Sequence, residues 1–204
     1  DAAALAEQAA GDGYECVTVH LGWGLEDDAE AGRLIEAILS ASSRSRVPLY
    51  VETHRATVFQ DMWRTVQFTR QFPELRFNGD FSHWYAGQEM VYGGFEKKLA
   101  FIAPVLDRVR FLHGRIANPG CILVAIGTDE EPSYVTHFRQ LWTASFRGYL
   151  DSGEKCPIYF VPELLAPDIY YARVFEGVEE SDRWQQSLLL KDIASECYTQ
   201  ASSS

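Results

Sequence analysis

The sequence predicts an α/β fold in which helices cover a parallel sheet. Two observations support this prediction. Short apolar segments with β-branched and aromatic residues, typical of buried strands, alternate along the chain with longer segments whose apolar residues have helical spacing. No linker rich in proline, glycine or serine interrupts this alternation. Strands and helices that alternate in this way favour parallel strands with the helices outside, and we expect one domain over residues 1–204.

The predicted strands are short and end in polar residues. They are Cys16–Leu21, the run that begins at Leu49, the run from Arg76 to Asp80, Val109–His113 and Ile158–Glu163. The first is followed by a predicted turn at Gly22-Trp23-Gly24. The Leu49-Tyr50-Val51 run leads directly into Glu52-Thr53-His54-Arg55. Polar groups at the end of a buried strand must be paired or functional, because burying them without partners costs free energy.

The predicted helices lie between these strands. They are Asp1–Ala10, Glu26–Ser43, Thr57–Phe72, about Glu96–Leu106, Thr136–Tyr149 and Arg183–Tyr198. Pro73 ends the third helix, since proline has no backbone N–H to continue it. The region 167–177 is predicted to be a loop, and the closing residues 201–204 are expected to fray.

The strand ends favour a barrel of the TIM (β/α)8 type. Such barrels carry their chemistry at the carboxyl ends of the strands, where the polar groups of this sequence lie. A closed barrel has eight strands in roughly 250 residues. Only five strands can be predicted in these 204 residues. We therefore expect the chain to be the later part of a barrel that is incomplete at its N-terminus.

The composition excludes several classes of protein. The net charge of −11 and the lack of a basic stripe argue against a nucleic-acid partner. No apolar run has the roughly 18 residues that a membrane span needs. The N-terminus has no basic-then-apolar signal-peptide profile, and the four cysteines form no Cys-x-x-Cys pair. We expect reduced thiols and a cytoplasmic protein.

Four residues at successive strand ends form a candidate metal site: Glu52, Asp80, His113 and Glu163. If all four side chains point into the mouth of one barrel, they meet. Three carboxylates and one imidazole suit one divalent ion of manganese, magnesium, cobalt or zinc. Each residue alone has an ordinary structural explanation, such as an ion pair, a helix cap or a core histidine.

The other histidines have less distinctive surroundings. His137 lies within a predicted helix with no carboxylate pattern around it, so we expect it to be structural. His20 ends a strand, and both a pocket-lining and a structural role remain open for it.

The motifs Glu52-Thr-His-Arg55, Asp80-Phe-Ser-His-Trp84, His113-Gly-Arg115 and Pro162-Glu163 resemble those of the xylose isomerase-like TIM-barrel superfamily. The similarity is greatest to its sugar phosphate isomerase/epimerase branch and runs from about Cys16 to Tyr198. In that branch, Glu, Asp, His and Glu hold one divalent metal in this chain order. The resemblance implies that the five predicted strands are strands four to eight of the barrel.

The resemblance implies roles for individual residues. Glu52, Asp80, His113 and Glu163 would bind the metal, and Glu52 and Glu163 would also transfer protons as catalytic carboxylates. His83, three residues after the metal Asp, would contact substrate. The arginine that follows the metal His would be Arg115, although it lies closer to that His than in ketose epimerases. His54, Arg55 and His20 complete the set of expected substrate-binding residues.

The implied activity is a metal-dependent sugar or sugar phosphate isomerase or epimerase, which removes a proton next to a carbonyl and forms an enediolate. Two alternatives stay open: a metal-dependent dehydratase on the same scaffold, and a non-catalytic barrel that binds metal or carbohydrate. The expected partner is a small sugar or sugar phosphate, and assembly into a homo-oligomer is compatible with the sequence. Trp23 and Trp84 are candidates for an apolar wall against a sugar ring or for packing in the core or at the rim. The endonuclease IV relatives of this fold resemble the chain less, because they need additional histidine ligands.

Overall fold

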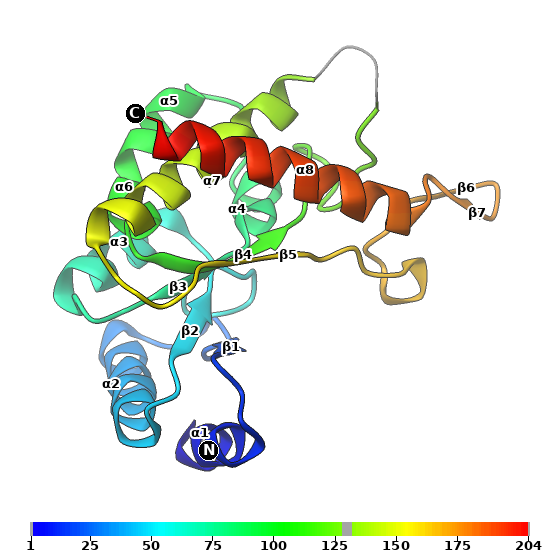
Figure 1. Cartoon of the computed structure of the whole chain (residues 1–204). Helices are drawn as coiled ribbons and strands as arrows, with labels where there is room; N and C mark the ends of the chain where they lie inside the picture. Colours follow the sequence, from blue (N-terminus) through cyan, green and yellow to red (C-terminus); the bar gives the residue numbers. More distant parts are fainter. Residues whose placement is uncertain (1, 128–131, 204) are drawn as a thin grey trace.

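The sheet of this protein has five parallel strands in chain order, in a computed structural model that describes residues 2–127 and 132–203 (Figure 1). The strands are β1 (Val17–Val19), β2 (Leu49–Glu52), β3 (Phe77–Gly79), β4 (Val109–Gly114) and β5 (Tyr159–Pro162). Each pairs in parallel with the next. The sheet curls into a half-barrel flanked by helices, which confirms the predicted fold class.

Helices follow the strands and lie outside the sheet. They are α1 (Ala2–Asp12), α2 (Asp28–Ser45), α3 (Met62–Gln71), α4 (Phe81–Gly87), α5 (Phe95–Phe101), α6 (Ala103–Leu106), α7 (Ser133–Ser152) and α8 (Arg183–Ser202). Figure 1 shows α1 and α2 beside β1 and β2, and α7 and α8 together beside β4 and β5. Within the described part of the chain, no helix is long and apolar enough to cross a membrane.

Two helices begin at aspartates that were not predicted to cap them. The helix expected from Thr57 begins at Met62, because the Asp61 side chain accepts a hydrogen bond from the backbone N–H of Arg64. Thr57 instead closes a turn, in which its hydroxyl donates to the carbonyl of His54 at 2.7 Å. The strand expected to run through Asp80 ends at Gly79, and Asp80 caps helix α4.

Other boundaries also differ from the prediction. The helix expected over Glu96–Leu106 divides into α5 and α6 near Pro104, which cannot donate the backbone hydrogen bond that a continuous helix needs. The expected loop at 167–177 contains a short 3₁₀ helix, Pro167–Ile169, and the strand β6 (Val174–Phe175), which pairs with β7 (Val178–Glu179). Helix α8 continues beyond its predicted end at Tyr198 as far as Ser202, and its Ala201 is buried in the core.

The core lies between the sheet and the helices and is rich in aromatic residues. Its largest fully buried apolar side chains include Trp84, Trp142, Phe59, Phe77 and Phe138. Trp84 donates its indole N–H to the carbonyl of Phe59 at 2.9 Å, so it packs in the core and forms no wall of an open pocket. Trp23 is 79% exposed and lies on the surface.

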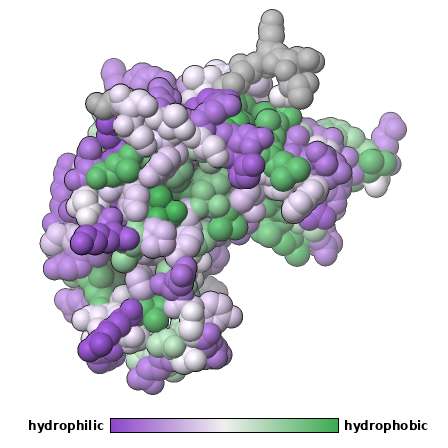
Figure 2. Space-filling model, viewed as in Figure 1, coloured by the Kyte–Doolittle hydropathy of each residue, from purple (hydrophilic) through white to green (hydrophobic). Residues whose placement is uncertain are grey.

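The end of the molecule that carries β6 and β7 shows hydrophobic and hydrophilic residues side by side (Figure 2). Phe175, Val178 and Trp184 are exposed there. This end projects away from the sheet in Figure 1. The polar groups at the strand ends lie instead along the carboxyl edge of the sheet, where β2, β3, β4 and β5 finish side by side.

Candidate functional site

The four predicted metal ligands come together at the carboxyl edge of the sheet. Glu52 is the last residue of β2, Asp80 follows β3, His113 is the penultimate residue of β4, and Glu163 follows β5. His113 Nδ1 lies 3.5 Å from a Glu52 oxygen, 3.7 Å from an Asp80 oxygen and 3.6 Å from a Glu163 oxygen. One imidazole nitrogen therefore faces all three carboxylates.

Two glycines allow this close approach of the strand ends. A Cβ on Gly79 would lie 2.8 Å from the ring of Phe81, and a Cβ on Gly114 would lie 2.4 Å from the ring of Phe160. Both positions exclude larger residues because the neighbouring atoms belong to packed aromatic rings. Gly79 thus lets the chain turn directly from β3 into the helix that Asp80 caps.

Asp80 is held rigidly as well as buried. Its Oδ1 accepts hydrogen bonds from the backbone N–H of Ser82 at 3.1 Å and from the Ser82 hydroxyl, and its carbonyl accepts from the hydroxyl of Thr53 at 3.0 Å. Burial favours the neutral carboxylic acid, but the charge of Arg115 outweighs burial and holds the pKa of Asp80 below its usual range. Asp80 is therefore an ionised and preorganised carboxylate.

Asn78 belongs to this cluster, although the sequence did not single it out as a site residue. It pairs with Glu52 in the parallel register of β2 and β3. Its side-chain amide donates to Glu52 at 2.9 Å and lies 3.2 and 3.3 Å from the two ring nitrogens of His113. The sequence pattern places Asn78 on the same face of its strand as Asp80. It does not give the register between β2 and β3, which sets Asn78 beside Glu52.

Arg115 lies beneath the carboxylates and does not face solvent. Its guanidinium forms an ion pair with Asp80, lies 2.8 Å from a Glu163 oxygen and donates to the hydroxyl of Ser82 at 2.9 Å. The side chain has no exposed surface. The expected direct contact of Arg115 with a substrate is not available in this arrangement. Its contacts make it a partner that positions Asp80 and Glu163.

His83 is likewise buried. Its Nε2 accepts a hydrogen bond from Arg115 at 2.9 Å, and its ring lies 3.7 Å from the ring of His54. Burial lowers the pKa of His83 to about 3, despite the nearby charge of Asp80, so its ring is neutral. A substrate would meet His54 before it met His83, because the side chain of His83 has no exposed surface.

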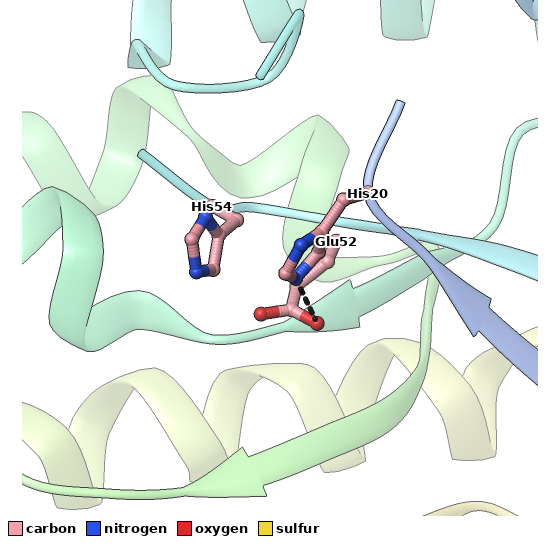
Figure 3. Close-up of side chains that lie close together, drawn as sticks. All are labelled: His20, Glu52 and His54. Carbon is pink, nitrogen blue, oxygen red and sulfur yellow. Dashed lines mark ion pairs between the residues drawn. The ribbon is translucent and has the colours of Figure 1, made fainter. Parts of the chain in front are cut away.

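His20 and His54 lie at the rim of the cluster (Figure 3). His20 Nε2 is 3.3 Å from a Glu52 oxygen, and the ring centres of His20 and His54 lie 4.0 Å apart. The hydrogen bond with Glu52 raises the pKa of His20, whereas burial lowers the pKa of His54. Both residues therefore lie beside the cluster, His20 exposed and His54 half-buried.

Arg55 is exposed and contacts the cluster through Tyr171. The ring centre of Tyr171 lies 5.2 Å from the Arg55 guanidinium carbon and 4.8 Å from that of Arg115. Both distances are within the range of cation–π attraction. Tyr171 comes from the loop after β5, and no motif in the sequence distinguished it from its neighbours.

His137 lies apart from this cluster. Its ring stacks on Phe95 at 3.8 Å, and its Nδ1 is 2.8 Å from the hydroxyl of Tyr85. These contacts are those of a packed histidine, in agreement with its expected structural role.

The cluster carries more negative than positive charge. The carboxylates of Glu52, Asp80 and Glu163 face the single guanidinium of Arg115, which leaves two negative charges when His113 is neutral. Burial alone lowers the pKa of His113, but hydrogen bonds with Asp80 and Glu52 raise it to about 10. Burial alone raises the pKa of Glu52, but hydrogen bonds with His113 and His20 lower it to about 2. A proton on His113 thus balances part of the excess charge.

A divalent cation fits this donor set. Among the described residues, Glu52, Asp80 and His113 each offer one ligand atom within 4.8 Å of the others, and Glu163 adjoins His113. Two ligands at right angles and about 2.1–2.2 Å from an ion are roughly 3 Å apart. The observed separations of 3.5–3.7 Å need only a small closure. A dication would replace the proton of His113 and neutralise the two remaining charges.

No model of a protein family matches the chain, and no curated protein matches its sequence. The chain is similar in structure to a xylose isomerase-like TIM barrel protein from Mycobacterium smegmatis, whose crystal structure is in complex with magnesium. The TM-score is 0.55 at 12% identity, and the likeness covers 97% of this chain and 66% of that one. This chain thus spans about two thirds of that protein's length, and it has a TIM-barrel type of fold, as the sequence predicted.

Proposed function

We propose that this protein is a divalent-metal-dependent isomerase or epimerase of sugars or sugar phosphates. The observation that carries the proposal is the convergence of three carboxylates on one imidazole nitrogen, at the carboxyl edge of a parallel sheet. Catalytic groups lie at this edge in TIM barrels. The structurally similar protein is in complex with magnesium, which supports binding of a divalent cation by a protein of this fold.

The residues that would hold the cation are Glu52, Asp80, His113 and Glu163. They form an oxygen-rich set with one imidazole, which suits Mg²⁺ or Mn²⁺ and also accepts Co²⁺ or Zn²⁺. When bound, a divalent cation polarises a substrate carbonyl and stabilises the negative charge that develops on its oxygen. Asn78 and Arg115 keep the ligands oriented through their contacts with Glu52, Asp80 and Glu163.

Glu52 and Glu163 are the proposed proton-transfer groups. Glu52 comes from β2 and Glu163 from the end of β5, so the two approach the centre from different sides of β3 and β4. Removal of a proton next to the carbonyl by one glutamate yields an enediolate. Return of a proton from the opposite face by the other glutamate inverts the carbon centre.

The rim of the site provides groups for substrate oxygens. His20 and Arg55 are exposed, and His54 is half-buried between His20 and His83. The exposed guanidinium of Arg55 suits a phosphate or carboxylate group of a substrate. The ring of Tyr171, held between two arginines, provides an apolar surface near the carboxylates. These residues make a small polyhydroxylated molecule, with or without phosphate, the proposed substrate.

The test combines metal binding with proton exchange. We expect the chain to bind Mn²⁺ and, with metal present, to exchange a substrate C–H for deuterium in D₂O when incubated with a panel of ketoses and ketose phosphates. Glu52→Gln should weaken Mn²⁺ binding at least about 100-fold and abolish exchange, because a ligand and a base are both lost. Glu154→Gln, which changes a glutamate outside the cluster, is the matched control.

Three outcomes would contradict the proposal. Unchanged Mn²⁺ affinity in Glu52→Gln would mean that Glu52 has only a structural role. Metal binding without exchange on any substrate would favour a non-catalytic binder. Deuterium incorporation accompanied by loss of water from the substrate would favour a dehydratase.

A further inference from the structure

A second group of ligand-type side chains adjoins the first. His20, Glu52 and His54 each offer one ligand atom, and these atoms lie within 4.8 Å of one another. Figure 3 shows both imidazoles on the same side of the Glu52 carboxylate. His20 comes from the end of β1, and Glu52 and His54 come from the end of β2. Two neighbouring strand ends therefore bring the three side chains together.

The protonation of His54 prepares it to bind a cation. Its Nδ1 lies 2.5 Å from the carbonyl oxygen of Arg55. A carbonyl can only accept a hydrogen bond, so Nδ1 carries the proton and Nε2 keeps its lone pair. Metal-binding histidines commonly donate their second N–H to a backbone carbonyl in this way, which fixes the ring and its tautomer. The backbone N–H of His54 is also held, at 2.9 Å from the carbonyl of Glu52.

Glu52 lies between the two groups of ligands. The same Glu52 oxygen is 3.3 Å from His20 Nε2 and 3.5 Å from His113 Nδ1. The Glu52 side chain is 3% exposed, whereas that of His20 is 54% exposed. An ion between His20 and His54 would therefore lie nearer to solvent than one between Asp80 and His113. A carboxylate placed between two cations about 3.5–4 Å apart is the usual bridge of two-metal sites.

We propose that His20, Glu52 and His54 form a second divalent-cation site, with Glu52 shared between the two centres. Two imidazoles and one carboxylate favour Zn²⁺ or Co²⁺ over Mg²⁺, in contrast to the oxygen-rich first centre. Three protein ligands leave coordination positions open for water or a substrate oxygen. The proposal rests on the proposed function only through Glu52, which both centres use.

The test is the number of cations bound by the full chain, measured by calorimetric titration with Co²⁺ and by elemental analysis. We expect two equivalents in the wild-type protein. His20→Ala and His54→Ala should each weaken one equivalent at least about tenfold and remove its contribution to the Co²⁺ absorption spectrum. His137→Gln is the matched control, because it changes a histidine outside both groups, and it should still bind two equivalents.

Asp80→Asn separates this proposal from the proposed function, because Asp80 belongs only to the first centre. Loss of one equivalent in Asp80→Asn and of the other in His20→Ala would support both. An equivalent lost in His20→Ala, with binding unchanged in Asp80→Asn, would support the second site and contradict the proposed function. A single equivalent that depends on Asp80 and not on His20 would overturn the second site alone. Two equivalents retained in both histidine variants would also overturn it, and absence of cation binding would overturn both.

Discussion

Two buried arginines lie close to the two ends of strand β4, and they differ in how their charges are balanced. Arg110, near the start of the strand, forms a two-pronged ion pair with Glu154 at 2.7 and 3.0 Å, and Glu154 also pairs with Arg76. Arg115, just past the other end, faces Asp80 and Glu163. A tyrosine ring lies against each guanidinium, Tyr149 at 5.7 Å and Tyr171 at 4.8 Å respectively.

The cluster at the start of the strand is complete within the protein. The remaining nitrogen of Arg110 donates to the backbone carbonyls of Asp107 and Val109. In the described chain, none of Arg76, Arg110 and Glu154 has a buried side-chain atom without a partner. Two arginines and one glutamate also leave no excess of negative charge. These residues have the contacts of a structural ion cluster.

At the carboxyl end of the strand, the polar atoms and charges are not all paired within the protein. Asn78 Oδ1 and His83 Nδ1 are buried without a hydrogen-bond partner, and Arg115 Nη1 is close to Glu163 without an aligned hydrogen bond. Three carboxylates exceed the single arginine. Buried polar groups are normally satisfied, and their occurrence beside an excess of carboxylates is consistent with the cation site proposed above. The comparison teaches that charge balance distinguishes the structural ion cluster from the candidate site.

The largest expected effect comes from Arg115→Met. This change leaves the buried Asp80 carboxylate without its ion-pair partner, and we expect a loss of about 3–5 kcal/mol in the free energy of unfolding. Added Mn²⁺ should recover a large part of this loss, because the more negative cluster attracts a cation more strongly. Urea titrations with and without Mn²⁺ measure both effects. Equal destabilisation with and without Mn²⁺ would argue against a cation among these carboxylates.

Glu154→Gln tests the opposite end of the strand and should have a smaller effect. Arg110 loses a charged partner but keeps its two backbone carbonyls, and Glu154 is about one-third exposed. We expect a loss of about 2 kcal/mol in the free energy of unfolding, with no change in Mn²⁺ affinity. Urea titration and calorimetry measure the two quantities. Weaker Mn²⁺ binding in this variant would show that the two clusters are coupled.

The smallest expected effect is a difference in acid stability between wild type and Glu154→Gln. Hydrogen bonds from Arg110, together with those from Arg76, outweigh burial and lower the pKa of Glu154 from 4.5 to about 2. A lowered pKa stabilises the fold above about pH 4.5, and this stabilisation is lost as the pH falls toward 2. We expect about 1–2 kcal/mol for this partly exposed group. Unfolding midpoints between pH 6 and 3 should converge for the two proteins, and a constant gap would contradict the assignment.

Much of the site followed from local patterns. Glu52, His113 and Glu163 end apolar runs, and parallel strands bring their carboxyl ends to one edge. That reasoning needs only the alternation of side chains along a strand and the order of the elements. It also placed Asp80 near its partners, although Asp80 caps a helix and does not continue a strand.

Other parts depended on contacts between distant segments. Arg115 and His83 were expected to face a substrate, and both are buried against Asp80. Asn78 and Tyr171 entered the site without a signal in the sequence. The direction of a side chain beyond the last strand residue depends on the loop and on its neighbours, which short-range periodicity does not describe.

The sequence by itself determined the strand–helix alternation, the parallel sheet and the residues that end its strands, because burial of apolar runs and the two-residue period of a strand are local properties. Only the tertiary structure decided which carboxylates share a counter-ion, which histidines reach solvent and how Glu52 lies between two groups of ligands. These features depend on strand register and on packing between residues far apart in the chain, and both are settled only when the sheet curls and brings the strand ends together.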